Sequence, residues 1–284
     1  MSAAWAAPPK SALAGAPVPF AHGLLWKVQR AGSAPSYVFG TVHSEDARIL
    51  ELPAPVREAL DRTRSLTLEV DLDAGALQRV SEAMYYRDGR DLESVIGASL
   101  YRDCVHLMAT YGVSEERLHA MKPWVVVATL SRPPPQRGAF LDLALYRRAV
   151  EAGKTVYGLE RIDEQIHYFD DMTLADQVAL LRDTVRHHAD MPRMFDEILR
   201  AYLARDLGEL MAINTRYLRL GDPALARRFT TRFVTRRNRL MVERMQPRLV
   251  EGGAFIAVGA LHLPGDEGIL QLLARRGYRV ESVY

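Results

Sequence analysis

Four side chains that can bind a metal or move a proton stand at the ends of predicted strands. His43 closes the stretch GTVH and His262 closes GALH, while Glu69 lies in LTLEVD and Glu160 in TVYGLE. In three-layer α/β folds, ligands bind where the carboxyl ends of strands meet loops. If these four strands run parallel in one sheet, the four side chains meet at one edge. Two imidazoles with one or two carboxylates suit a divalent zinc, manganese, cobalt or iron ion.

A catalytic metal at this edge would keep one coordination position for water, lower the pKa of that water and polarise a bound carbonyl. A carboxylate outside the ligand set, either Glu160 or Glu164, would accept the water proton and return it to the leaving group. The plainer alternative is that each histidine is a surface or structural residue and that each carboxylate faces solvent on a half-buried strand. The repeated pattern of strand, glycine, two residues and histidine favours the metal site.

The two histidine motifs belong to similar elements near the two ends of the chain. Near the start, residues 22–73 predict two strands, a helix over 53–62 and a third strand. Near the end, a strand over 254–259, a helix over 268–276 and a strand over 278–283 form a β-α-β unit. Matching units at both ends predict two halves of one sheet.

The stretches between these two units are mostly helical. A helix over 141–152 and a strand over 155–160 separate two predicted helical insertions, at 74–135 and 163–250. The sequence therefore predicts a single three-layer α/β domain over 23–284, with a central mixed sheet flanked by helices.

Residues 1–22 are rich in alanine and proline and predict a flexible leader. They lack the basic start and the continuous apolar stretch of a signal peptide. As written, the chain is expected in the cytoplasm, and a periplasmic location would require that a signal peptide had been removed before residue 1. No run of about 18 apolar residues predicts a membrane span.

Composition and missing motifs argue against several other kinds of site. The 284 residues include one cysteine, Cys104, which can form no internal disulfide and is a poor start for a thiolate metal site. The absence of G-x-S-x-G, P-loop and G-x-G-x-x-G motifs counts against serine hydrolases, phosphate-loop NTPases and dinucleotide enzymes. The net charge of +2 gives no overall attraction to nucleic acid. Ten arginines and two acids over 216–248 leave nucleic-acid binding as a less favoured reading, because the apolar residues there have the spacing of a helix that faces a core.

Taken together, these motifs resemble the TraB/GumN/Tiki family. The resemblance covers nearly all of residues 23–284 and rests on blocks that occur in family order: Leu25-Trp26-Lys27-Val28, Gly40-Thr41-Val42-His43, Leu68-Glu69-Val70-Asp71, Phe140-Leu141-Asp142, Gly158-Leu159-Glu160 with Glu164-Gln165, Arg237-Asn238 with Met241, and Val258-Gly259-Ala260-Leu261-His262-Leu263. It implies a fold similar to the erythromycin-esterase/ChaN-like superfamily. It also implies a metal-dependent hydrolase, a Tiki-like metallopeptidase that uses manganese, cobalt or zinc on a peptide or small-molecule substrate.

The resemblance carries roles onto individual positions. His43, Glu69 and His262 match the metal-binding positions, and Glu160 matches a further acid that would ligate the metal or act as the base. Arg237 and Asn238 match an Arg-Asn pair expected near the site as a partner for an oxyanion or a carboxylate. Arg161 stands where many members have a threonine, which leaves local substrate contacts open. The alternative is a non-enzymatic ligand-binding or haem-binding protein of the ChaN-like type.

Overall fold

The computed structural model describes residues 17–71, 75–133 and 140–284. Its centre is a six-stranded sheet with the strand order β4-β3-β5-β2-β1-β6. The strands are β1 (Leu25–Gln29), β2 (Ser36–Thr41), β3 (Ser65–Asp71), β4 (Thr155–Arg161), β5 (Ala254–Gly259) and β6 (Arg279–Ser282). The sheet is mixed, as the sequence predicts.

Four neighbouring strands of this sheet run parallel. The strand β5 lies between β2 and β3, with Gly40 of β2 beside Val258 and Thr67 of β3 beside Ile256. The strand β4 extends the parallel set beyond β3, whereas β1 is antiparallel to both β2 and β6. The first and last β-α-β units therefore interleave in one sheet, and the carboxyl ends of β4, β3, β5 and β2 share one edge.

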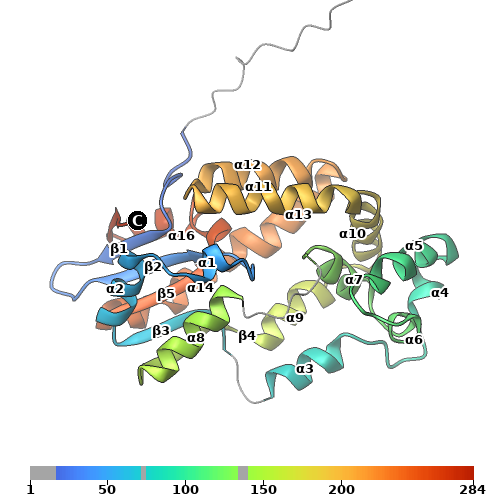
Figure 1. Cartoon of the computed structure of the whole chain (residues 1–284), viewed down its shortest axis with the longest axis horizontal. Coiled ribbons are helices and arrows are strands. Elements are labelled where there is room, and N and C mark those ends of the chain that lie inside the picture. Colours follow the sequence, from blue (N-terminus) through green and yellow to red (C-terminus); the bar gives the residue numbers. More distant parts are fainter. Residues whose placement is uncertain (1–16, 72–74, 134–139) are drawn as a thin grey trace, which may run out of the picture.

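Helices cover both faces of the sheet. The helices α1 (Ala47–Leu50), α2 (Ala54–Arg62) and α8 (Leu141–Glu151) lie in front of it in Figure 1, and α8 contacts β3 and β4. Behind it lie α14 (Arg236–Arg244), α15 (Gln246–Glu251) and α16 (Ile269–Arg275), which contact β4, β5 and β6 respectively. Because both faces are covered, the central strand β5 is apolar and is buried almost throughout.

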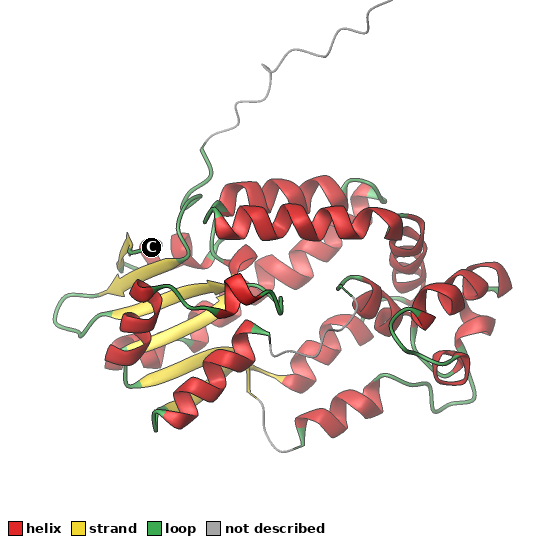
Figure 2. Cartoon of the chain, in the orientation of Figure 1, coloured by secondary structure: helices red, strands yellow, loops and turns green. Residues whose placement is uncertain are grey.

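The two insertions are helical, and Figure 2 shows that they extend the molecule beyond the sheet. The first holds α3 (Ala76–Ala83), α4 (Leu92–Ile96), α5 (Ala98–Ala109), α6 (Glu115–His119) and α7 (Pro123–Leu130). The second holds α9 (Ile162–Asp170), α10 (Leu174–Arg186), α11 (Met191–Leu203), α12 (Leu207–Leu218) and α13 (Pro223–Thr230), and a π-helical turn over Thr231–Thr235 leads into α14. A second hydrophobic core, formed by α4 to α7 with Leu181 of α10, holds Cys104 buried. We call α4 to α7, together with Leu181 of α10, the helical lobe.

Residues 1–16 of the predicted leader lie outside the described residues. Residues 17–22 contact the body of the protein, since Gly265 donates its N–H to Pro19 O and Gly208 donates to Ala21 O, each at 2.9 Å. The Phe20 ring also packs edge-on against Trp26. No helix of the described part is both long and apolar enough to cross a membrane. The single-domain organisation stays a prediction.

The arginine-rich stretch 216–248 is largely paired within the molecule. Its ion pairs include Arg216 with Glu197, Arg228 with Asp176, Arg239 with Glu267 and Arg244 with Glu164. These acids balance much of the local positive charge.

Candidate active site

The four strand-end residues singled out in the sequence come together at the shared carboxyl edge of the sheet. Glu160 is on β4 and Glu69 is on the neighbouring β3. His262 closes a 3₁₀ turn (Ala260–His262) after β5, and His43 follows β2 by two residues. Gly40 of β2 allows the turn after β5 to pack closely against it, because a Cβ at Gly40 would lie 2.9 Å from Leu263 Cδ1 and 3.2 Å from Ala260 Cα.

Arg237 joins the two glutamates beneath this edge. Its Nη2 donates to Glu69 Oε2 at 2.8 Å and to Glu160 Oε2 at 2.6 Å, and its Nε donates to Glu160 Oε1 at 3.0 Å. Burial alone would lower the pKa of Arg237, but the two carboxylates raise it above its ordinary value. The guanidinium is therefore charged, and two carboxylates hold its Nε and Nη2 groups.

Glu160 has both carboxylate oxygens occupied. Gln165 Nε2 and the Tyr168 hydroxyl each donate to it at 3.1 Å, in addition to Arg237, and its side chain is inaccessible to solvent. These donors hold Glu160 as the counter-charge of Arg237.

His262 is held in one tautomer by Asn238. The Asn238 amide donates from Nδ2 to Glu267 O at 2.8 Å, which turns its Oδ1 toward His262 Nδ1 at 2.6 Å. Since Oδ1 only accepts, Nδ1 carries the proton and Nε2 keeps its lone pair. Burial lowers the pKa of His262, which favours this neutral ring. Its Nε2 lies 3.4 Å from Arg237 Nη1 and 3.8 Å from Glu69 Oε1.

Glu69 is the carboxylate at the centre of the edge. Burial opposes its ionisation, but the charge of Arg237 and the Gly259 N–H, which donates to Glu69 Oε1, lower the pKa of Glu69 below its ordinary value. A Cβ on Gly259 would lie 3.1 Å from Glu69 Oε1, so the glycine permits this close approach. Glu69 is thus an anion at neutral pH.

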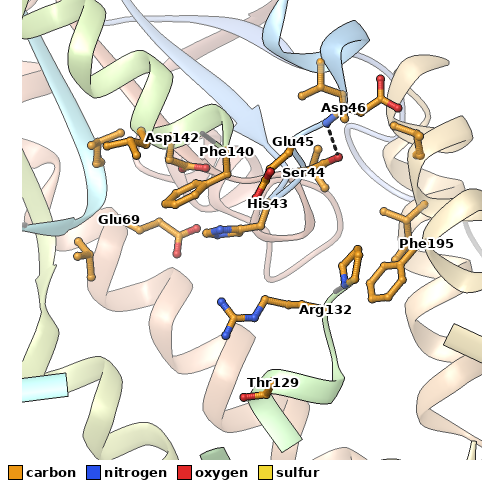
Figure 3. Close-up of a pocket in the computed structure, with 18 of the residues that line it drawn as sticks. His43, Ser44, Glu45, Asp46, Glu69, Thr129, Arg132, Phe140, Asp142 and Phe195 are labelled. Carbon is orange, nitrogen blue, oxygen red and sulfur yellow. Dashed lines mark hydrogen bonds between the residues drawn. The ribbon is translucent and has the colours of Figure 1, made fainter. Parts of the chain in front are cut away.

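On the other side of Glu69, a cavity of about 840 Å³ lies between the sheet edge, the helical lobe and α11. Figure 3 shows His43 and Glu69 pointing toward one another in it, with Phe140 beside them. The His43 ring is exposed and lies 5.4 Å from the Phe140 ring. Glu69 and Gln165 line the cavity and also contact Arg237 or Glu160, so they connect the cavity to the buried network.

Among the described residues, the other charged side chains that line this cavity are Glu45, Asp46, Arg132, Asp142 and Asp196, and sequence reasoning assigned none of them a role at the site. Asp142, in the first turn of α8, accepts from Thr41 Oγ1 at 3.0 Å through Oδ1, whereas its buried Oδ2 has no hydrogen-bond partner among the described residues. Burial raises the pKa of Asp142. Arg132 reaches in from the end of α7. The only sequence signal was the Phe140-Leu141-Asp142 block, and nothing marked Arg132.

Other sequence candidates lie away from the cavity. Glu160, Arg237, Asn238 and His262 do not line it. Glu164 accepts the Arg161 N–H at 2.8 Å at the start of α9 and pairs with Arg244, whose hydrogen bonds to it lower the pKa of Glu164. Its carboxylate is occupied at this helix end, and its catalytic role stays a prediction.

The donor types at the edge fit a divalent metal, since neutral imidazoles and an ionised carboxylate are its usual ligands. Two ligands about 2.1 Å from one ion lie about 3.4 Å apart at a tetrahedral angle. The 3.8 Å between His262 Nε2 and Glu69 Oε1 is close to this spacing. Within residues 17–71, 75–133 and 140–284, however, no three His, Cys, Asp or Glu side chains are already spaced to hold one ion.

Comparisons with known proteins place these residues in context. The chain is 24% identical to a protein named metalloprotease TIKI2 from Danio rerio, over 92% of this chain and 61% of that protein. It is 26% identical to a metalloprotease TIKI homolog from Amphimedon queenslandica, over 92% of this chain and 62% of that protein. The chain thus spans about three fifths of the length of these relatives.

No solved structure matches the chain closely enough to compare. The model of the TraB/PrgY/gumN family matches residues 24–282, which include the whole sheet and every residue of the site. This chain therefore belongs to the TraB/PrgY/gumN family.

Proposed function

We propose that this protein is a metal-dependent hydrolase that cleaves peptides in the cavity at the carboxyl edge of the sheet. The observation that carries the proposal is the position of Glu69, which faces His43 across the cavity and lies 3.8 Å from His262 Nε2. The relatives of this chain in Danio rerio and Amphimedon queenslandica are named metalloproteases, which supports the same chemistry here.

His43, Glu69 and His262 would hold the metal, and we propose manganese, cobalt or zinc, which these donor types suit. When bound, such an ion lowers the pKa of a coordinated water and polarises a carbonyl oxygen. The remaining residues prepare the ligands. Arg237 and the Gly259 N–H keep Glu69 ionised. Asn238 holds the His262 proton on Nδ1, so that Nε2, which Arg237 Nη1 contacts at 3.4 Å, carries the lone pair.

We assign the role of general base to Asp142. Its buried Oδ2 accepts no hydrogen bond from a described residue, and Asp142 lines the cavity with His43 and Glu69. Burial raises its pKa, which brings a carboxylate closer to the range in which it can accept and return a proton. Glu160, the base expected from the sequence, has both oxygens engaged by Arg237, Gln165 and Tyr168.

The side chains that line the cavity also suit a peptide substrate. Apolar side chains such as Phe140, Phe195 and Leu199 share it with the polar groups of the sheet edge. An apolar wall with a few polar groups is typical of sites that hold an organic substrate and orient one bond for reaction.

The test is cleavage of a peptide library by the full chain, stripped with EDTA and then supplied with manganese, cobalt or zinc. We expect turnover only with metal, and a loss of at least about 100-fold in His43→Ala. The control is His22→Ala, because His22 is exposed and pairs with Asp206 away from the cavity. Full activity in His43→Ala, or activity unaffected by metal removal, would contradict the proposal. A haem Soret band with no turnover would favour the non-enzymatic alternative.

A further inference from the structure

We propose that Arg132 binds a carboxylate of the substrate, so that the protein prefers peptides with an acidic group at a fixed distance from the cleaved bond. The inference rests on the proposed function, because it names a substrate class for the same cavity. It concerns the wall opposite the strand-end residues.

The backbone of Arg132 is fixed to the helical lobe. Arg132 follows α7, whose apolar residues belong to the lobe's hydrophobic core. Its carbonyl accepts from the Tyr111 hydroxyl at 2.8 Å, and its Nε donates to Ala128 O at 3.1 Å. The side chain is therefore anchored at its base while its guanidinium end extends into the cavity, as Figure 3 shows.

The outer part of this guanidinium is free among the described residues. Neither Nη of Arg132 makes a hydrogen bond or ion pair with a described residue, whereas Arg237, the arginine expected from the sequence, is occupied by Glu160 and Glu69. An arginine with two open Nη groups is the usual partner for a carboxylate, which it binds through parallel hydrogen bonds.

The charges of the cavity favour a carboxylate at this wall in particular. Arg132 is the one arginine or lysine in the described lining, whereas the acidic lining residues, Glu69 and Asp142 together with Glu45, Asp46 and Asp196, repel an anionic group. Attraction to Arg132 and repulsion from Glu69 and Asp142 together orient a substrate, with its carboxylate at the lobe and its scissile bond near His43. Arg132 is exposed, and stabilising a transient oxyanion requires donors fixed in a site without water, so carboxylate binding is the better assignment.

The test compares labelled heptapeptides of Ala, Phe and Leu. One set carries a single Glu at each position in turn with an amidated C-terminus, a matched set carries Gln, and a third has a free C-terminal carboxylate and no Glu. Fluorescence anisotropy in EDTA reports binding by the full chain, and cleavage is measured separately with metal. The two carboxylate sets distinguish an acidic side chain from a chain terminus.

We expect wild type and Arg102→Gln to bind at least one carboxylate peptide ten-fold or more tighter than its neutral match. Arg102 is the control because it is exposed on α5 of the same lobe and lies outside the cavity. Arg132→Gln should lose the preference, and Arg132→Lys should keep part of it, because the charge remains while the forked geometry is lost.

Equal binding of acidic and neutral peptides by wild type, or a preference that survives in Arg132→Gln, would overturn the inference. Cleavage without any preference would leave the proposed function standing and remove this inference alone. A preference for carboxylate peptides in binding, with no cleavage under any metal, would leave this inference standing and remove the proposed function. The absence of both binding and cleavage would overturn both.

Discussion

The buried network beneath the sheet edge and the cavity beside it contain similar charged groups, but they differ in how completely these groups are paired. In the network, Arg237 is bound by Glu69 and Glu160, and the His262 Nδ1–H is bound by Asn238. In the cavity, neither Asp142 Oδ2 nor the outer guanidinium of Arg132 has a partner within the part of the chain that the structure describes. Paired side chains fix the positions of the residues in the network. Side chains of the cavity with an unpaired group can still bind a ligand that reaches that group.

This difference separates two kinds of effect that substitutions should have. Removing one member of a paired buried network leaves an uncompensated charge or polar group and destabilises the fold. Replacing an open group removes at most one native hydrogen bond and should impair function more than stability. The following predictions are ordered by their expected effect on the free energy of unfolding.

The largest effect is expected for Arg237→Ala. The substitution leaves Glu69 and Glu160 buried without their shared cation, which should lower the free energy of unfolding by about 3–5 kcal/mol. Urea denaturation of this variant and of Arg102→Ala, an exposed control, measures it. A loss below about 1 kcal/mol would mean that the network does not stabilise the fold as described.

Asn238→Leu should cost less, about 1–3 kcal/mol, because it leaves the His262 Nδ1–H and Glu267 O without their partners. NMR of the His262 ring should show a proton on Nδ1 in wild type and a mixture of tautomers in the variant. A wild-type ring protonated on Nε2 alone would contradict the assigned orientation.

Glu164→Gln should have a smaller, pH-dependent effect. Because Arg244 lowers the folded-state pKa of Glu164 from its ordinary 4.5, the charged pair contributes stability above pH 4.5 and loses it as the pH falls through the lower folded value. The variant should therefore be less stable than wild type at pH 7, by about 1 kcal/mol, and equal to it in strong acid. A difference that grows toward low pH would contradict this sign.

Asp142→Asn should leave stability unchanged or slightly higher. The Thr41 hydrogen bond can persist, while a buried carboxylate with one unpaired oxygen is removed. Peptide cleavage should nevertheless fall by about 100-fold if Asp142 is the general base. Destabilisation by more than about 1 kcal/mol would place Asp142 with the paired network instead.

Much of the fold and part of the site follow from local patterns in the sequence. Alternating apolar runs and turn residues mark the strands, and the repeated Gly-x-x-His pattern marks the ends of β2 and β5. Because β3, β5 and β2 are parallel neighbours, residues at equivalent strand ends lie at one edge, which explains why Glu69 lines the cavity with His43 and lies 3.8 Å from His262.

The remaining site residues depend on long-range packing that no local pattern encodes. Arg132 reaches the cavity only because the helical lobe lies beside the sheet edge. Asp142 is one of many acids in the first turn of a helix, and its open oxygen becomes evident only once Thr41 occupies the other. Likewise, the sequence around Glu160 predicts a catalytic base, but in the fold Arg237 donates hydrogen bonds to both of its carboxylate oxygens.

The most direct test of the central claim is a crystal soaked in manganese or cobalt and measured at the absorption edge of that metal. We predict one anomalous peak at the carboxyl edge of the sheet, at about 2.0–2.2 Å from donor atoms of His43, Glu69 and His262. The same soak of Glu69→Ala should give no peak there. Suppose that the protein cleaves peptides with the soaked metal. The account would then be contradicted by a crystal with no anomalous peak at this edge, or with a peak that none of the three residues contacts.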